Sequence, residues 1–260
     1  MHDNWQPGAW PILDYDASRK ALIEPQYESG AGVAIPECCV VCFFSDQIAL
    51  LAQEGQVRQV AALRSESGEH PVYLLARNGC EVTLFHPGVG APLAAGLLEE
   101  VIALGCNRFV VCGGAGVLDR AISRGHLLVP KTAVRDEGTS YHYLPPSREV
   151  SASPEALASI EGVLAQRGIA SLRTKTWTTD ALYRETAARI AARRAEGCLC
   201  VEMECAALFA VAQFRGVPLG AVLYGGDDVS GDVWDRRDWI DQHDVRRQLI
   251  YLAADAALNL

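Results

Sequence analysis

The stretch PLAAGLLEEVIALGCNRFVVCGGAG (residues 92–116) contains the structural unit from which the fold can be predicted. Apolar residues recur at helical spacing over residues 92–104, and Gly105 is a natural helix end. A short apolar strand is predicted over residues 108–112, and it runs into the glycine-rich stretch at residues 113–116. A helix that leads directly into an apolar strand is typical of α/β proteins.

The same alternation continues on both sides of this unit. Further strands are predicted at residues 38–44, 72–76, 81–86, 127–129, 133–135, 171–177, 198–201 and 219–224. Helices are predicted at residues 46–54 (with Ser45 as the N-cap), 154–166, 186–195, 204–214 and 243–258. No repeat or break in composition divides this pattern, so we predict one α/β domain over residues 37–260, with a central mixed, largely parallel β-sheet flanked by helices. Residues 1–36 lack clear periodicity and are predicted to form an N-terminal arm.

The composition is acidic, with 23 Lys and Arg residues against 32 Asp and Glu residues and a net charge of −9. Because neutralising phosphates requires clustered Lys and Arg, a general binder of DNA or RNA is not expected. A small anionic substrate remains compatible, since a local site can oppose the net field. The first residues do not resemble a signal peptide and no apolar run reaches about 18 residues, so we expect no contact with a membrane.

The nine cysteines are spread through apolar stretches. Cys39 and Cys42 have C-x-x-C spacing, but the valines between them indicate a buried strand rather than a metal or redox site. Free buried thiols favour a reducing, cytoplasmic setting. The six histidines are scattered without ligand spacing, so no metal site is predicted. Trp177 and Trp234 are interpreted as core or interface residues.

Three glycine-rich segments follow apolar strands and mark the candidate site, at residues 85–92, 111–116 and 223–228. Ligands of α/β sheets collect at the carboxyl ends of strands, and glycine lets the backbone approach a ligand closely. Gly88 and Gly90 lack the third glycine of a dinucleotide fingerprint. Each segment alone is typical of an ordinary turn, but three together favour a binding site.

Four carboxylates lie close to these segments: Glu202, Glu204, Asp227 and Asp228. One of the two glutamates could cap the helix that follows while the other faces a ligand's hydroxyl groups. Asp227 ends a strand, where burial would raise the pKa of its carboxyl group and suit it to act as an acid. An ordinary turn residue is the alternative for Asp227.

The segment Val201-Glu-Met-Glu-Cys-Ala-Ala207 resembles the V-E-M-E-x-A segment of the family of uridine phosphorylases, hexameric purine nucleoside phosphorylases and related nucleosidases. The likeness extends from about residue 38 over most of the chain. Residues 88–92 resemble the family's G-x-G-x-P-S loop, and residues 112–116 resemble its G-x-x-G loop. Thr178-Thr-Asp-Ala-Leu-Tyr183 is similar to its S-S-D-x-F-Y stretch.

The resemblance implies an enzyme that cleaves the N-glycosidic bond of a nucleoside. Glu204 matches the glutamate that holds the ribose hydroxyls, and Met203 matches the methionine that packs on the sugar, with Glu202 beside them. Asp227 falls where purine-acting members place the acid for the departing base, which makes the expected substrate purine-leaning. The implied substrate-binding set also includes Gly88, Gly90, Gly114, Thr178, Leu182 and Arg64, with Leu182 in place of a stacking aromatic residue.

The departures from the family gather at its phosphate site. Gln47 and Val111 stand where the family has arginines, and Gly114 replaces a phosphate-binding Ser or Thr. Of the phosphate arginines only Arg64 matches, one that the family lends across a dimer interface. Losing two bidentate anion ligands weakens phosphate binding. Arg135 or the glycine segments are the remaining candidates for binding an anion.

Three hypotheses therefore stay open: a nucleoside phosphorylase that releases the free base and ribose 1-phosphate, a phosphate-independent nucleosidase, and a non-catalytic nucleoside-binding protein. The phosphorylase is favoured, with inorganic phosphate as co-substrate and no other cofactor. The resemblance also implies a homo-oligomer, from dimer to hexamer. The particular nucleoside and the number of subunits do not follow from the sequence.

Overall fold

The computed structural model describes residues 8–25 and 35–260. The strands are β1 (Cys38–Cys42), β2 (Val57–Ser65), β3 (Gly68–Arg77), β4 (Cys80–Phe85), β5 (Arg108–Val117), β6 (Leu127–Asp136), β7 (Glu149–Ser151), β8 (Ser171–Thr179), β9 (Cys198–Glu202) and β10 (Leu219–Asp228). The α-helices are α1 (Ser45–Gln53), α2 (Ala91–Ala103), α3 (Pro154–Gln166), α4 (Ala187–Ala195), α5 (Cys205–Arg215) and α6 (His243–Leu258). Short 3-10 turns include η1 (Pro11–Leu13), η2 (Thr139–His142), η3 (Leu182–Arg184) and η4 (Trp239–Asp241).

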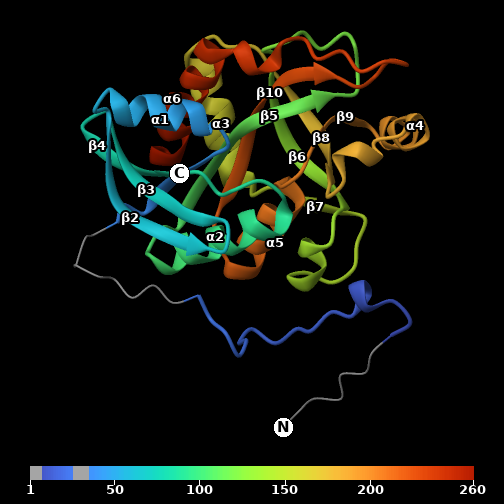
Figure 1. Cartoon of the computed structure of the whole chain (residues 1–260), viewed down its shortest axis with the longest axis horizontal. Coiled ribbons are helices and arrows are strands. Elements are labelled where there is room, and N and C mark those ends of the chain that lie inside the picture. The colour runs from blue at the N-terminus through green and yellow to red at the C-terminus, as the bar shows by residue number, and fades with distance from the viewer. Residues whose placement is uncertain (1–7, 26–34) are drawn as a thin grey trace.

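All ten strands belong to one mixed sheet, as the sequence predicts. Its order is β10-β6-β8-β9-β5-β1-β4-β3-β2, with β7 beside β6 and an additional pairing of β10 with β5. That additional pairing closes β5, β10, β6, β8 and β9 into a ring, from which β1, β4, β3 and β2 extend (Figure 1). Parallel pairs join β5 to both β1 and β10, so the carboxyl ends of these three strands lie at one edge.

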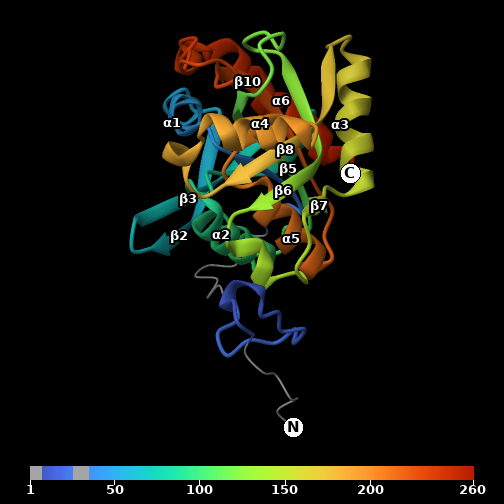
Figure 2. The ribbon, with the colours of Figure 1, turned by 90° about the vertical axis from the view of Figure 1, so that its right-hand side faces the viewer.

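Helices cover both faces of the sheet. Helices α2 and α5 pack together on one face, and α3 packs with α6 on the other, where α1 also lies (Figure 1). Two main clusters of buried apolar residues fill the two interfaces, one beneath α2 and α5 and one beneath α6 and α3. Residues 8–25 lie outside these layers (Figure 2), where the Arg19 guanidinium stacks 4.9 Å from the ring of Phe214. Within the described residues no helix is long and apolar enough to cross a membrane.

Several local predictions are confirmed. The turn between β3 and β4 is formed by Asn78 and Gly79, both with positive φ (52° and 78°), as an Asn-Gly hairpin requires. Helices α3 and α6 have the predicted bounds. Cys39 and Cys42 lie fully buried in β1, because that strand is covered on both faces.

Other local predictions are wrong. Strand β2 was not predicted, since most of its residues are half-buried or exposed and give no apolar run. The glycine-rich stretches after residues 112 and 224 are not loops, because they continue β5 and β10 and pair with each other. The two short strands predicted between residues 127 and 135 are one strand, β6, with an irregularity after Pro130. Ser45 is the first residue of α1 and makes no capping hydrogen bond.

Candidate active site

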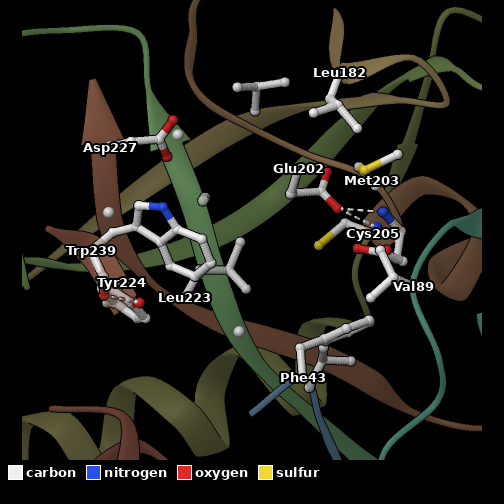
Figure 3. Close-up of a pocket in the computed structure, with 18 of the residues that line it drawn as sticks. Phe43, Val89, Leu182, Glu202, Met203, Cys205, Leu223, Tyr224, Asp227 and Trp239 are labelled. Carbon is white, nitrogen blue, oxygen red and sulfur yellow. Dashed lines mark hydrogen bonds between the residues drawn. The ribbon is translucent and has the colours of Figure 1, made fainter. Parts of the chain in front are cut away.

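A cavity of about 310 Å³ opens where the carboxyl ends of β5 and β10 meet the start of α5 (Figure 3). This volume is at the lower end of the range for small-molecule sites. Segments far apart in the sequence contribute to its wall, among them Phe43, Phe44, Val89, Val111, Gly113–Gly116, Leu182, Glu185, Val201–Cys205, Leu208, Leu223, Tyr224, Gly226, Asp227, Trp239 and Arg246. All three glycine-rich segments predicted from the sequence reach the cavity, the first through Val89.

The two glutamates of the Val-Glu-Met-Glu segment divide the tasks of capping and facing the cavity. Glu202 Oε2 accepts hydrogen bonds from the backbone N–H groups of Glu204 (2.7 Å) and Cys205 (2.6 Å), so it caps α5. Its Oε1 accepts from the hydroxyls of Thr178 (2.6 Å) and Thr176 (3.1 Å). With four donors on one carboxylate, Glu202 holds the start of α5 in place. Thr178 is engaged in the same network, because its Oγ1 also accepts from the N–H of Ala206.

Glu204 is the glutamate that remains available to a ligand. Its Oε1 accepts from the backbone N–H of Gly90 at 2.6 Å, which links α5 to the loop before α2. Burial, and then the charge of Glu202, raise the pKa of the Glu204 carboxyl to about 8. Met203 and Val89 lie in the same part of the cavity wall (Figure 3). A buried carboxyl beside apolar side chains is suited to holding hydroxyl groups.

A second acidic centre lies across the cavity, at the end of β10. Asp227 Oδ2 accepts a hydrogen bond from Trp234 Nε1 at 2.7 Å. Glu185 lines the same cavity, and burial together with the negative charge of Asp227 raises the pKa of its carboxyl to about 7. Gly116 leaves little room beside this centre, because a Cβ at that position would lie 3.4 Å from Asp227 Oδ1 and 3.1 Å from Val201 Cγ1.

Glu185 is a cavity residue that the sequence analysis does not identify. It follows Leu182 by three residues, in the short segment between β8 and α4 that carries the family-like Thr-Thr-Asp stretch. This closeness to Leu182 in the sequence is the signal that could have identified Glu185 as a site residue. Leu182, 48% exposed, also lines the cavity. Trp177 is fully buried in the core, as predicted. Trp234 is 60% exposed and donates to Asp227, so it is not a core residue of this chain, and its prediction as an interface residue stays a prediction.

The remaining sequence-predicted residues lie in the loop before α2 or outside the cavity. Gly88 has φ 78°, and a Cβ there would come within 2.2 Å of the Leu93 side chain, so only glycine fits this turn. His86 anchors the same loop by accepting the Gly88 N–H at 3.0 Å. Asp228 pairs with Arg237 at 2.6 Å and does not line the cavity.

The arginines considered for an anion differ in position. Arg64 is exposed on β2 and pairs with Glu69, outside the cavity of its own chain. Arg135 is buried under the 139–148 segment, where it donates to Ser140, Ser147 and two backbone carbonyls, so it is not available to the cavity. Val111 does line the cavity, and Gln47 lies buried behind it, bonded to His243 Nδ1 at 3.2 Å. An arginine that the sequence did not suggest, Arg246, takes part in the wall.

These features are those of the phosphorylase superfamily, whose sequence profile matches residues 37–258. The chain belongs to this family of nucleoside-cleaving enzymes. It is 27% identical over 205 residues to a guanosine phosphorylase of Halorubrum lacusprofundi, an alignment that covers 70% of this chain and 84% of the relative. It is 31% identical over 157 residues to a uridine phosphorylase of Treponema pallidum, covering 55% of this chain and 61% of that protein.

Solved structures share the fold at lower identity. The purine nucleoside phosphorylase of Toxoplasma gondii, in complex with immucillin-H, superposes with a TM-score of 0.72 at 18% identity, covering 87% of this chain and 92% of that one. The AMP nucleosidase of Bacteroides thetaiotaomicron superposes with a TM-score of 0.68 at 23% identity, covering 85% and 87%. The single α/β domain and its mixed sheet are thus those of the family.

Proposed function

We propose that the chain is a nucleoside phosphorylase that cleaves the N-glycosidic bond of a purine nucleoside to give the free base and ribose 1-phosphate. The observation that supports this most is the meeting of Glu204 and Asp227 in one cavity, although they come from different elements of the fold. Asp227 lies on a different part of the wall from Met203, the residue that directly precedes Glu204 (Figure 3), as a sugar and a base joined by one bond would require.

In this proposal Glu204 accepts hydrogen bonds from the ribose hydroxyls, and Met203 packs on the sugar. Ribose hydroxyls that donate to Glu204 favour its charged form, against the burial that raises its pKa. Such contacts strengthen as positive charge develops on the ribose ring in the transition state. The base lies towards Leu182 and Asp227.

The proton for the departing base is proposed to come from Asp227 and Glu185. As the bond from C1′ to the base breaks, its electron pair moves to the base, and an acid near purine N7 relieves the resulting charge. Because burial, and then the charge of Asp227, raise the pKa of the Glu185 carboxyl to about 7, Glu185 retains a proton close to neutral pH. An oxygen of inorganic phosphate then forms the new bond to C1′.

Hydrolysis of the same bond is the second candidate. Phe43 and Val111 present apolar surface in the cavity wall, and Val111 does so where the resemblance expects a phosphate-binding arginine. A water molecule would then replace phosphate as the nucleophile. We further propose that the enzyme is a homo-oligomer, from dimer to hexamer, because Arg64 does not line the cavity of its own chain. A cytoplasmic location is proposed because eight of the nine cysteines are buried free thiols.

The test is base release from inosine, adenosine, methylthioadenosine and uridine, each with and without phosphate. Faster release from the purine nucleosides that depends on phosphate and yields ribose 1-phosphate is the expected result. Base release at an unchanged rate without phosphate would show that the reaction is hydrolysis and not phosphorolysis. Binding of nucleosides without any release would indicate a non-catalytic protein. Light scattering of the purified chain measures the number of subunits.

A further inference from the structure

A buried guanidinium, that of Arg246, lies in the cavity wall at the end that lacks the family's arginines. Arg246 belongs to the first turn of α6 and is 6% exposed. Its Nη1 donates to the carbonyl of Ile240 at 3.0 Å, and its Nη2 donates to Asp46 Oδ1 at 2.6 Å. The guanidinium also stacks 4.9 Å from the ring of Phe44.

One donor of this guanidinium is left over. Arg246 Nε is buried and has no hydrogen-bond partner among the described residues. Leaving a buried charged donor without a hydrogen bond is costly, so such donors are uncommon in proteins in the absence of a ligand. Nε and Nη2 form one edge of the guanidinium fork, and Asp46 occupies only one of these two donors. The edge is therefore half-used, and Arg246 is among the residues that line the cavity.

We infer that Arg246 binds the phosphate co-substrate, through the guanidinium edge that Asp46 leaves half-occupied. This inference rests on the proposed function. The Arg246 guanidinium supplies the positive charge that is missing because Gln47 and Val111 stand where the family has arginines. Asp46 directly precedes Gln47, so a cation from α6 reaches the first turn of α1 across 200 residues of sequence. A planar fork of donors suits the oxygens of a phosphate better than a single ammonium group would.

The charges of the cavity also favour this end for an anion. The acidic residues that line the cavity are Glu185, Glu202, Glu204 and Asp227, and Arg246 is the one basic residue that lines it in the described chain. The backbone at Gly114 is exposed to the cavity close to Tyr224, which leaves the strand end open to a small anion. The carboxylate of Asp46 repels an anion at this end, and His243 Nδ1 lies 3.6 Å from Asp46 Oδ2.

The opposition between Asp46 and a bound phosphate allows a test in which two substitutions have opposite effects. We expect Arg246→Gln to weaken binding of inorganic phosphate by about 10-fold or more, as measured by calorimetric titration of the full chain, because a charge-assisted fork is lost. Asp46→Asn is expected to tighten phosphate binding, since it removes a repelling negative charge and replaces a charge-assisted acceptor of Nη2 by a weaker neutral one. If Arg246 only neutralises Asp46, both variants lose stability together and the phosphate affinity stays the same in each.

Arg247→Gln is the matched control, because Arg247 is the next residue of α6 but points to Glu54 and does not line the cavity. It should bind phosphate as the native chain does. Circular dichroism checks that the variants fold. If Arg246→Gln does not fold, the test rests on Asp46→Asn, and phosphate binding by Asp46→Asn that is unchanged or weaker than that of the native chain overturns the inference. Native-like affinity in a folded Arg246→Gln also overturns it.

The two proposals fail in different ways. Absence of base release from every nucleoside in the presence of phosphate removes the proposed function, while the phosphate titrations still report on Arg246. Base release by a chain that shows no phosphate binding removes the inference and leaves nucleoside cleavage by water. In the expected result, Arg246→Gln raises the phosphate KM and leaves nucleoside affinity unchanged.

Discussion

Gly90 donates its backbone N–H to Glu204 Oε1 at 2.6 Å, although the two residues are 114 positions apart. The bond joins the loop before α2 to the residue that precedes α5, and these helices pack together on one face of the sheet. Because Glu202 caps α5 from the other side, Glu204 is held by two independent contacts at the cavity. A pre-positioned carboxyl needs no reorganisation when the sugar binds.

Glu204→Gln should lower kcat and raise KM together, for a loss in kcat/KM of about 10- to 100-fold. The reason is that hydrogen bonds to a charged group contribute about 1.5–3 kcal/mol and strengthen in the transition state. Steady-state kinetics on the preferred nucleoside measure both constants. The exposed Glu66 offers the control Glu66→Gln, with native kinetics. Full activity in Glu204→Gln would reject its role.

Asp227→Asn should reduce kcat for purine nucleosides by about 10²- to 10⁴-fold, the usual contribution of a general acid. The amide keeps the shape of the side chain, so the melting temperature should change little. Asp232→Asn, in the exposed loop that follows β10, is the control and should retain activity. Equal turnover in the Asp227 variant would remove this residue from the mechanism.

Glu185 should set a pH dependence near neutrality. With the pKa of its carboxyl raised to about 7, Glu185 is protonated below that pH and loses its proton above it. If the proton serves the departing base, kcat/KM falls as the pH rises through about 7, because this ratio reports ionisations of the free enzyme. Glu185→Gln should remove the inflection. An inflection that persists in the variant would belong to another titrating group.

Glu204 should also make stability depend on pH. Its pKa is about 8 in the folded chain and near 4.5 when unfolded, so between these pH values the folded state holds a proton that the unfolded state has lost. The free energy of unfolding therefore declines as the pH rises from 4.5 to 8, by at most about 1.4 kcal/mol per pH unit from this group. Urea unfolding of the native chain and of Glu204→Gln across this range compares the slopes, and the variant's should be shallower. Identical slopes would contradict the assignment.

Glu202→Ala should destabilise the fold by about 2 kcal/mol or more, because it leaves buried donors unpaired at the start of α5 and on β8. Denaturant unfolding measures this loss, with Glu66→Ala as an exposed control within about 0.5 kcal/mol of the native chain. A native-like free energy of unfolding would show that the cap contributes little.

Much of the fold could be predicted because its signals are local. Helices α3 and α6 and the Asn78-Gly79 turn follow from periodicity and from backbone preferences within a few residues. Strand β2 escaped prediction because its burial pattern depends on its partner β3 rather than on its own apolar residues. The glycines of β5 and β10 looked like loops because their strand pairing is with each other, across more than 100 residues.

The sequence by itself determined the alternation of strands and helices, the family to which the Val-Glu-Met-Glu segment points, and the absence of arginine at positions 47 and 111. Only the tertiary structure decided which glutamate caps α5 and which faces the cavity, and it alone brought Glu185 next to Asp227. It also placed Arg246 beside Asp46. The physical reason is that propensity and periodicity act over neighbouring residues, whereas burial, charge pairing and the donor left over on a guanidinium arise when distant segments pack.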